Sequence, residues 1–212
     1  MKRRVFVAAL TPGIAALSGG VAWKTQQQGR LITEPNETWL RDLTGQHKQF
    51  FDVSAPLDGA ALRRVANFLD AYRDAYGLSD VQVNAVFGAH GDGLAFVLND
   101  SMWARFELGV RYSIGDPSTQ KPARRNVYND SGSSTSGRIT VSSLQKRGVR
   151  FIACQKSITR LAREFAASEK TTEAELTATI ERGLLVGVTP VPAMVVAANR
   201  AQEQGLAYVF VG

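Results

Sequence analysis

The chain contains a single cysteine, Cys154, and its thiol is the first candidate for chemistry. Cys154 closes the apolar run 149–154, and a segment with helical periodicity begins just after it. The backbone N–H groups at the start of a helix stabilise a thiolate and make it a better nucleophile, and Lys156 and Arg160 would act in the same direction. The alternative interpretation is an inert thiol, because free cysteines are among the most buried residues in proteins.

His90 is the second candidate, because it follows another apolar run, 81–87, inside the glycine-rich segment 88–93. If both runs are parallel strands, His90 and Cys154 share the carboxyl edge of one sheet, where open α/β proteins bind ligands. An imidazole at this rim could transfer a proton or orient a ligand, whereas an ordinary loop histidine would only bind the backbone. The glycine spacing is neither GxGxxG nor a P-loop, so it does not indicate a nucleotide site.

The small number of cysteines and histidines limits the other kinds of site. One cysteine excludes an intramolecular disulfide and every CxxC motif, and the chain has only two histidines, His47 and His90. Structural zinc sites need four such ligands, so we expect no metal and no cofactor. A weaker alternative is a haem or metal binder that uses His90 or Cys154 as a ligand.

Hydrophobic periodicity predicts the elements that position these residues. Strands are expected at 49–54, 81–87, 149–154, within 184–191 and at 206–211. Helices are expected at 59–76, 94–98, 101–108, 157–165, 173–182 and 193–204. Apolar residues recur at three- and four-residue spacing in the helix at 59–76, and Gly77 should end it. This alternation predicts an α/β domain, with a mostly parallel five-stranded sheet and helices on both faces.

The first 22 residues are typical of an export signal. A basic start is followed by a short apolar stretch, and small residues at Gly20 and Ala22 suit cleavage before Trp23. The pair Arg3-Arg4 before an apolar segment is similar to a twin-arginine signal, although ordinary Sec export also fits. An uncleaved membrane anchor is the alternative, but the apolar stretch is short for a span of about 20 residues. We therefore expect a periplasmic or otherwise exported protein.

Charge and hydropathy narrow the partners of the mature chain. The net charge is +6, but residues 1–22 carry three of these charges and no acidic residue, which leaves +3. Such a small excess is not the clustered basic face that nucleic acid requires, so we expect no nucleic-acid partner. No later stretch is long and apolar enough to span a membrane, so no stable span is expected after signal removal.

The remaining chain divides into an arm and one domain. Polar residues dominate 23–46, which we interpret as an N-terminal arm or linker that runs over the surface. The domain is expected at 47–212, with a long loop at 112–138 that is rich in serine, threonine, glycine and asparagine. A loop of this length inside a compact domain is usually functional or disordered.

Three runs of the sequence resemble elements of the DsrE/DsrF-like family, in particular its exported subgroup. The run 148–155 (Gly-Val-Arg-Phe-Ile-Ala-Cys-Gln) is similar to the family's cysteine element. The run 184–193 (Leu-Leu-Val-Gly-Val-Thr-Pro-Val-Pro-Ala) is similar to its Leu-Leu-Pro…Val-Pro-Ala element, with Val186 where the family often has proline. The run 201–208 (Ala-Gln-Glu-Gln-Gly-Leu-Ala-Tyr) is similar to its Gln-Glu-x-Gly ending. The resemblance covers residues 47–212.

The resemblance implies a flavodoxin-like fold, a homo-oligomer (trimer or hexamer), and a cysteine at position 154 that carries sulfur as a persulfide. On this interpretation the chain is a sulfur carrier or sulfurtransferase, with a sulfur donor or acceptor protein as its partner and His90 handling protons. The alternative is a non-catalytic oligomeric binding or assembly module in which Cys154 is structural and the arm and the loop contact partners. The sequence leaves open whether the protein is an enzyme.

Overall fold

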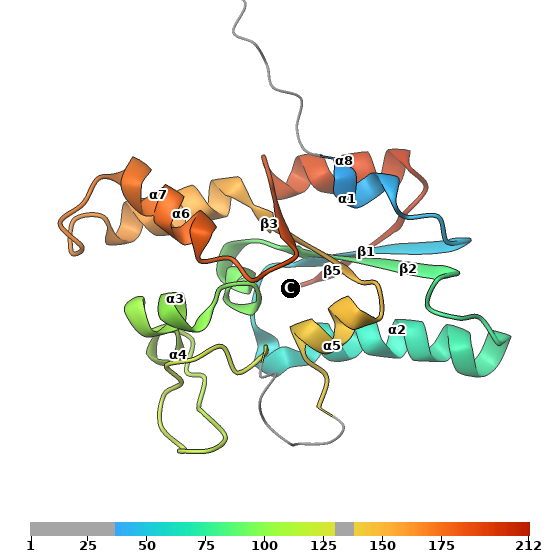
Figure 1. Cartoon of the computed structure of the whole chain (residues 1–212), viewed down its shortest axis with the longest axis horizontal. Coiled ribbons are helices and arrows are strands. Elements are labelled where there is room, and N and C mark those ends of the chain that lie inside the picture. Colours follow the sequence, from blue (N-terminus) through green and yellow to red (C-terminus); the bar gives the residue numbers. More distant parts are fainter. Residues whose placement is uncertain (1–36, 130–137) are drawn as a thin grey trace, which may run out of the picture. The chain divides into compact units, whose positions relative to one another are not determined.

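A computed structural model describes residues 37–129 and 138–212, so the signal expected at 1–22 and part of the long loop lie outside the described residues. Five strands form one parallel sheet in the order β4-β3-β2-β1-β5 (Figure 1). They are β1 (His47–Val53), β2 (Val83–Ala89), β3 (Arg150–Cys154), β4 (Val188–Val191) and β5 (Ala207–Val211). This arrangement confirms the predicted α/β, flavodoxin-like class. The chain order reverses between β1 and β5, which is the topological switch point of the sheet.

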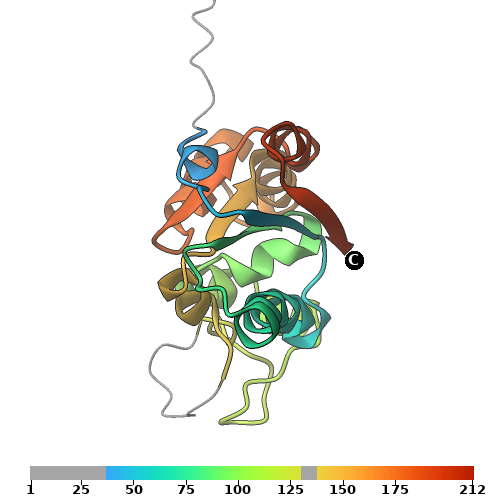
Figure 2. The same ribbon diagram turned by 90° about the vertical axis from the view of Figure 1, so that its right-hand side faces the viewer.

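Helices cover both faces of the sheet, as Figures 1 and 2 show. The α-helices are α1 (Thr38–Arg41), α2 (Ala60–Tyr76), α3 (Asp100–Arg105), α4 (Leu108–Arg111), α5 (Val141–Lys146), α6 (Gln155–Phe165), α7 (Glu173–Arg182) and α8 (Met194–Glu203). Two short 3-10 helices, η1 (Leu57–Gly59) and η2 (Gly91–Phe96), follow β1 and β2. Helices α1 and α8 lie over one face, and α2 and α5 lie over the other.

Alternation along the strands produces two buried clusters, because neighbouring side chains in a strand point to opposite faces. The larger cluster contains Phe51 and Phe87 and packs under α2 and α5, whereas Phe50 and Val86 belong to the cluster under α1 and α8. We call these the α2 face and the α8 face. The candidate site is built at the carboxyl edge of the α8 face.

Local sequence signals explain where several helices begin and end. Gly77 adopts a left-handed conformation with φ of 68° and ends α2, as predicted. Thr172 and Glu175 form a capping box at the start of α7, and Thr140 and Ser143 form another at the start of α5. The helix expected at 101–108 is divided, because Glu107 has a positive φ of 47° between α3 and α4.

The segment expected to be a surface arm joins the domain where the structure describes it. Residues 37–46 contain α1, and Trp39 and Leu40 are buried with the α8-face cluster. The Arg200 guanidinium of α8 also binds both carboxylate oxygens of Glu37, at 2.8 and 3.0 Å. The domain therefore begins before residue 47, because an apolar helix too short to look periodic covers part of the sheet.

The described part of the long loop, residues 112–129, is tied to the domain by buried groups. The Asn126 side chain donates hydrogen bonds to the Phe96 and Leu98 carbonyls at 3.0 and 2.7 Å and accepts one from the Tyr128 N–H at 2.9 Å. Asp116 accepts from the Arg125 guanidinium at 2.7 Å. This segment has little regular structure, yet the buried side chains of Asp116 and Asn126 are hydrogen-bonded within the domain.

Candidate functional site

Cys154 and His90 lie at equivalent places on neighbouring strands. Ala153 of β3 pairs with Ala89 of β2, so Cys154 and His90 are the next residues at the carboxyl edge of each strand. Cys154 belongs to the α8-face cluster. Ala89 faces the α2 side and the His90 backbone is extended, with φ of −143° and ψ of 174°, which directs His90 to the α8 face. The structure thus brings the two sequence-predicted residues to one rim and one face.

The Cys154 thiol is shielded rather than presented to solvent. The residue is the N-cap of α6, its side chain accepts no capping hydrogen bond, and it is only 5% exposed. It shares its cluster with Val191 at the end of β4 and with Met194 and Ala197 of α8. A reagent can therefore reach the sulfur only if this covering layer moves.

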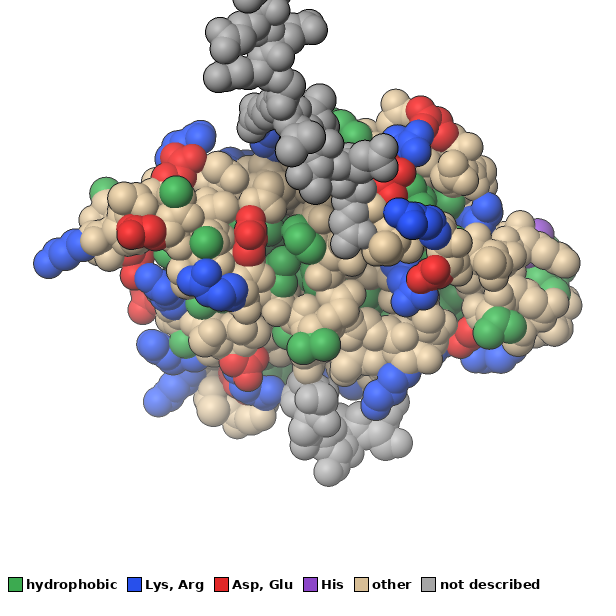
Figure 3. Space-filling model, turned by 45° about the horizontal axis from the view of Figure 1, so that its top comes forward, with side chains coloured by type: hydrophobic (Ala, Val, Ile, Leu, Met, Phe, Trp, Pro, Cys, Tyr) green, Lys and Arg blue, Asp and Glu red, His purple; other side chains and the backbone are tan. Residues whose placement is uncertain are grey.

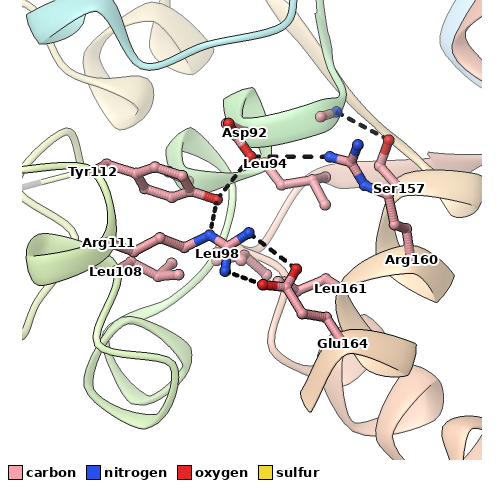
Figure 4. Close-up of a pocket in the computed structure, with 12 residues that line it drawn as sticks. Asp92, Leu94, Leu98, Leu108, Arg111, Tyr112, Ser157, Arg160, Leu161 and Glu164 are labelled. Atoms are coloured by element: carbon pink, nitrogen blue, oxygen red, sulfur yellow. Dashed lines mark hydrogen bonds and ion pairs between the residues drawn. The ribbon is translucent and has the colours of Figure 1, made fainter. Parts of the chain in front are cut away.

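Arg160, one of the two cations expected near the thiol, lies instead beside η2. Its guanidinium is 3.9 Å from the Asp92 carboxylate, and its side chain is 63% exposed. Figure 4 shows Arg160 on α6 directed toward Asp92. Lys156 is exposed.

His90 is paired with an acidic residue that the sequence did not single out. Its Nε2 atom lies 2.9 Å from Oδ1 of Asp52, near the end of β1. Both atoms are buried, and the ring N–H is not aligned as a regular hydrogen bond to that oxygen. The side chains are 27% and 14% exposed, so the pair sits at the margin of the core.

Tyr208 of β5 completes the group from the other side of β1. Its hydroxyl donates a hydrogen bond of 2.7 Å to Oδ2 of Asp52. Burial alone would raise the pKa of Asp52, but the contacts with His90 and Tyr208 outweigh burial and lower that pKa. Burial and the bond to Asp52 raise the pKa of Tyr208 to about 12. Tyr208 therefore remains a neutral donor and Asp52 a carboxylate at neutral pH.

Backbone contacts hold the segment around His90 in place. The His90 N–H donates to the Val53 carbonyl at 3.0 Å, and the Gly93 N–H donates to the His90 carbonyl at 2.9 Å. The Gly91 N–H donates to Ser157 Oγ at 2.9 Å, which joins this segment to the first turn of α6. His90 is thus fixed to the strand that carries Asp52 and to the helix that follows Cys154.

The glycines of this segment allow the protein to pack against itself. A Cβ atom on Gly88 would lie 2.6 Å from Met194 Sδ and 2.8 Å from Phe50 Cζ. A Cβ atom on Gly93 would lie 2.4 Å from the Val53 carbonyl oxygen. The space that a side chain would need at these two glycines is filled by α8 and β1.

A small cavity lies between η2, α4 and α6, and Figure 4 shows its polar rim. The Tyr112 hydroxyl donates to Asp92 at 3.2 Å, and Arg111 pairs with Glu164 through two hydrogen bonds. The cavity volume is about 10 Å³, which is enough for about one water molecule. The rim residues satisfy one another, so this cavity does not form a substrate site.

Within residues 37–129 and 138–212, the structure shows no group of three or more His, Cys, Asp or Glu side chains arranged to hold a metal ion. In the same part of the chain, no helix is long and apolar enough to cross a membrane. Basic and acidic side chains are interspersed on the face seen in Figure 3.

Sequence reasoning missed Asp52 and Tyr208 as site residues. Asp52 did carry a signal, because it is an acidic residue near the end of a predicted strand, at the edge where ligands bind. Tyr208 carried none, because a tyrosine within an apolar strand usually contributes to packing. Only the strand order, which puts β1 between β2 and β5, brings Asp52 to His90 and Tyr208 to Asp52.

Comparison with known proteins adds a fold likeness and no function. No family model and no curated protein matches the chain. A solved structure of a protein of unknown function from Methanobacterium thermoautotrophicum is similar over 78% of this chain and 99% of that protein. The two share 18% sequence identity, with a TM-score of 0.42.

Proposed function

We propose that this chain is an exported DsrE/DsrF-like protein that carries sulfur on Cys154. The observation that supports this function best is the placement of the only cysteine at the end of β3. There it begins an 11-residue helix, one strand away from His90. The helix start stabilises a thiolate, and His90 supplies a group that can accept the thiol proton.

The proposed reaction is transfer of sulfur from the persulfide of a donor protein or small molecule. The Cys154 thiolate attacks the outer sulfur of the donor persulfide, and a new S–S bond forms at Cys154. The S–S bond of the donor breaks, and the donor leaves as a thiolate. Sulfur at the same oxidation level moves from one thiol to another, so no external oxidant or reductant is needed.

The burial of Cys154 adds a requirement to this function. Because Cys154 is 5% exposed under the layer that contains Met194 and Val191, this layer must open for a donor to reach the sulfur. The first turn of α8 also contains exposed residues, with Val195 78% and Val196 48% exposed. Displacement of this turn would uncover Cys154 without breaking the sheet.

The decisive experiment is the alkylation of Cys154 in the folded mature protein as a function of pH, followed by intact mass. A sulfur carrier should react in the folded state, at a rate that rises as the pH increases the thiolate fraction. Incubation with a persulfide donor should then add the mass of one sulfur atom, and Cys154→Ser should abolish this gain. A Cys154→Ser protein that still gains sulfur would contradict the proposal.

A second candidate is a non-catalytic assembly module, and two observations favour it. Cys154 is buried, and the edge strand β5 leaves Tyr208, Val209 and Phe210 between 37% and 54% exposed. The opposite edge, β4, contains Pro190, which lacks an N–H group and so discourages strand addition. An unprotected apolar edge such as β5 is a typical surface for association with another chain.

This second function predicts a homo-oligomer in which the Cys154 thiol does not react while the protein is folded. Light scattering on the mature protein should give the mass of a trimer or hexamer, and Phe210→Lys should shift it toward the monomer. The matched control is Val81→Lys, which changes a 77% exposed residue away from β5. A thiol that reacts only after denaturation, together with this mass, would favour assembly. A monomeric wild-type protein would contradict it.

Export is part of the proposal, and the expected signal suggests the test. Protein isolated from the periplasm should begin at Trp23, and replacement of Arg3 and Arg4 by lysine should block export if the twin-arginine route is used. N-terminal sequencing and cell fractionation measure both outcomes. Full-length protein that remains in the cytoplasm would contradict export.

A further inference from the structure

The contact between His90 and Asp52 restricts where the ring carries its proton. Nε2 and Oδ1 are 2.9 Å apart, and both atoms are buried from water. Two unprotonated acceptors at this distance would repel each other, which favours a proton on one of the two atoms, even though the ring N–H is not aligned as a regular hydrogen bond to Oδ1. Because the contacts of Asp52 favour its carboxylate form, the proton belongs to Nε2. The second ring nitrogen, Nδ1, then keeps its lone pair in the neutral ring.

Asp52 is itself held on its other side. The Tyr208 hydroxyl donates to Oδ2 at 2.7 Å, and the Tyr208 ring stacks on Phe50 with centroids 6.3 Å apart. Asp52 lies in β1 between the paired strands β2 and β5, so its backbone is part of two ladders. The carboxylate therefore has little freedom to leave His90. This order of contacts, from tyrosine to aspartate to histidine, suits a group that orients an imidazole.

We propose that Asp52, anchored by Tyr208, is a positioning residue that holds His90 in the Nε2–H tautomer, so that Nδ1 accepts the proton released by the Cys154 thiol. The inference rests on the proposed sulfur-carrier function for the source of that proton. The S–H bond breaks, its electron pair stays on sulfur, and an N–H bond forms at Nδ1. The resulting imidazolium lies beside the Asp52 carboxylate, and the proton then passes to the thiolate that the donor leaves behind.

A merely structural Asp52–His90 pair makes a different prediction. A structural pair would change stability when mutated, but the reactivity of the thiol in the folded protein would not depend on it. The tautomer of His90 and the rate of Cys154 alkylation therefore distinguish the two roles. The only other histidine, His47, lies at the opposite end of β1 and stacks on Tyr72 with centroids 4.5 Å apart. It serves as an internal reference.

The test uses the mature protein with ¹⁵N-labelled histidine, and long-range ¹H–¹⁵N spectra at a pH of about 9, above the ordinary range of imidazole titration. The wild type should show the Nε2–H form at His90. In Asp52→Asn, the amide oxygen accepts from Tyr208 and the amide nitrogen donates to Nε2, so the tautomer should reverse. Alkylation of folded Cys154 at a pH of about 7 should slow about tenfold or more. Tyr208→Phe keeps the carboxylate, so it should keep the tautomer and slow the reaction less.

The outcomes separate this inference from the function on which it rests. An Nδ1–H form in the wild type, or an Asp52→Asn protein with unchanged tautomer and rate, would overturn the inference. The unchanged signals of His47 show that a variant is folded. If Asp52→Asn does not fold, the His90 tautomer in the wild type and in Tyr208→Phe still tests the inference, because both proteins should show the Nε2–H form. A different result would separate the two ideas. If Cys154 of the folded wild type is not alkylated, but the His90 tautomer still reverses in Asp52→Asn, the sulfur-carrier function is overturned. The pairing of Asp52 with His90 would then remain valid.

Discussion

Trp39 of α1 packs against Phe50 of β1, with their ring centroids 6.4 Å apart, in the same buried cluster that holds Cys154. Both rings are nearly inaccessible, at 5% and 0% exposure. A segment that the sequence suggested was an arm thus helps to cover the α8 face. Both α1 and α8 therefore contribute side chains to the buried cluster that contains Cys154.

Trp39→Ala should destabilise the domain and increase access to Cys154. Removal of a buried tryptophan side chain costs about 3–5 kcal/mol, measured as the free energy of unfolding in urea. The rate of Cys154 alkylation in the folded protein should rise, because the layer over the α8 face loses part of its packing. Arg41→Ala, at an exposed position on the same helix, is the control and should change neither quantity. An unchanged stability of Trp39→Ala would mean that α1 does not dock as described.

Gly88→Ala should lower stability because the added methyl group has no room. Its Cβ would lie 2.6 Å from Met194 Sδ and 2.8 Å from Phe50 Cζ, so α8 must shift away from the sheet. Overpacking of this kind costs about 1–3 kcal/mol. Gly115→Ala is the matched control, because its nearest neighbour, the Lys121 carbonyl oxygen, is 3.9 Å away. Equal unfolding midpoints for the two variants would refute the close approach of α8.

Asn126→Ala should loosen the segment 112–129 from the domain. The substitution leaves the Phe96 and Leu98 carbonyls without their donor, and buried unsatisfied groups cost about 1–3 kcal/mol each. Hydrogen exchange should accelerate in this segment and at the end of η2. Lys121→Ala, at an exposed position of the same segment, should leave exchange unchanged. Equal hydrogen-exchange rates of residues 112–129 in Asn126→Ala and Lys121→Ala would argue against the anchoring role of Asn126.

Stability should fall at acidic pH in a way that depends on Asp52. Its pKa is lowered in the folded state from an ordinary value of 3.8, so its contribution is fully present above that value. The contribution is lost as the pH falls through the lower folded-state pKa, where the unfolded chain binds the proton more readily. Urea unfolding from pH about 6 to about 2 should show a smaller loss for Asp52→Asn than for the wild type. If the free energy of unfolding falls by the same amount in Asp52→Asn and the wild type, the contacts of the Asp52 carboxylate do not stabilise the folded state.

Much of the secondary structure could be predicted because its signals are local. The helix expected at 59–76 is α2 at Ala60–Tyr76, and the strand expected at 206–211 is β5 at Ala207–Val211. The spacing of apolar residues marks a helix, Gly77 ends α2 and Thr172 caps α7. Each of these signals involves only a few neighbouring positions, so it is visible in the sequence. Helix α1 was missed because four residues are too few to show a period.

The sequence by itself determined the alternation of strands and helices, and hence the parallel α/β class with Cys154 and His90 at its carboxyl edge. Only the tertiary structure decided that β1 lies between β2 and β5, which brings Asp52 to His90 and Tyr208 to Asp52. It also decided that α1 and α8 share one buried cluster with Cys154. The physical reason is that strand order and helix docking arise from packing between segments far apart in the chain, whereas periodicity and capping record only what each segment does locally.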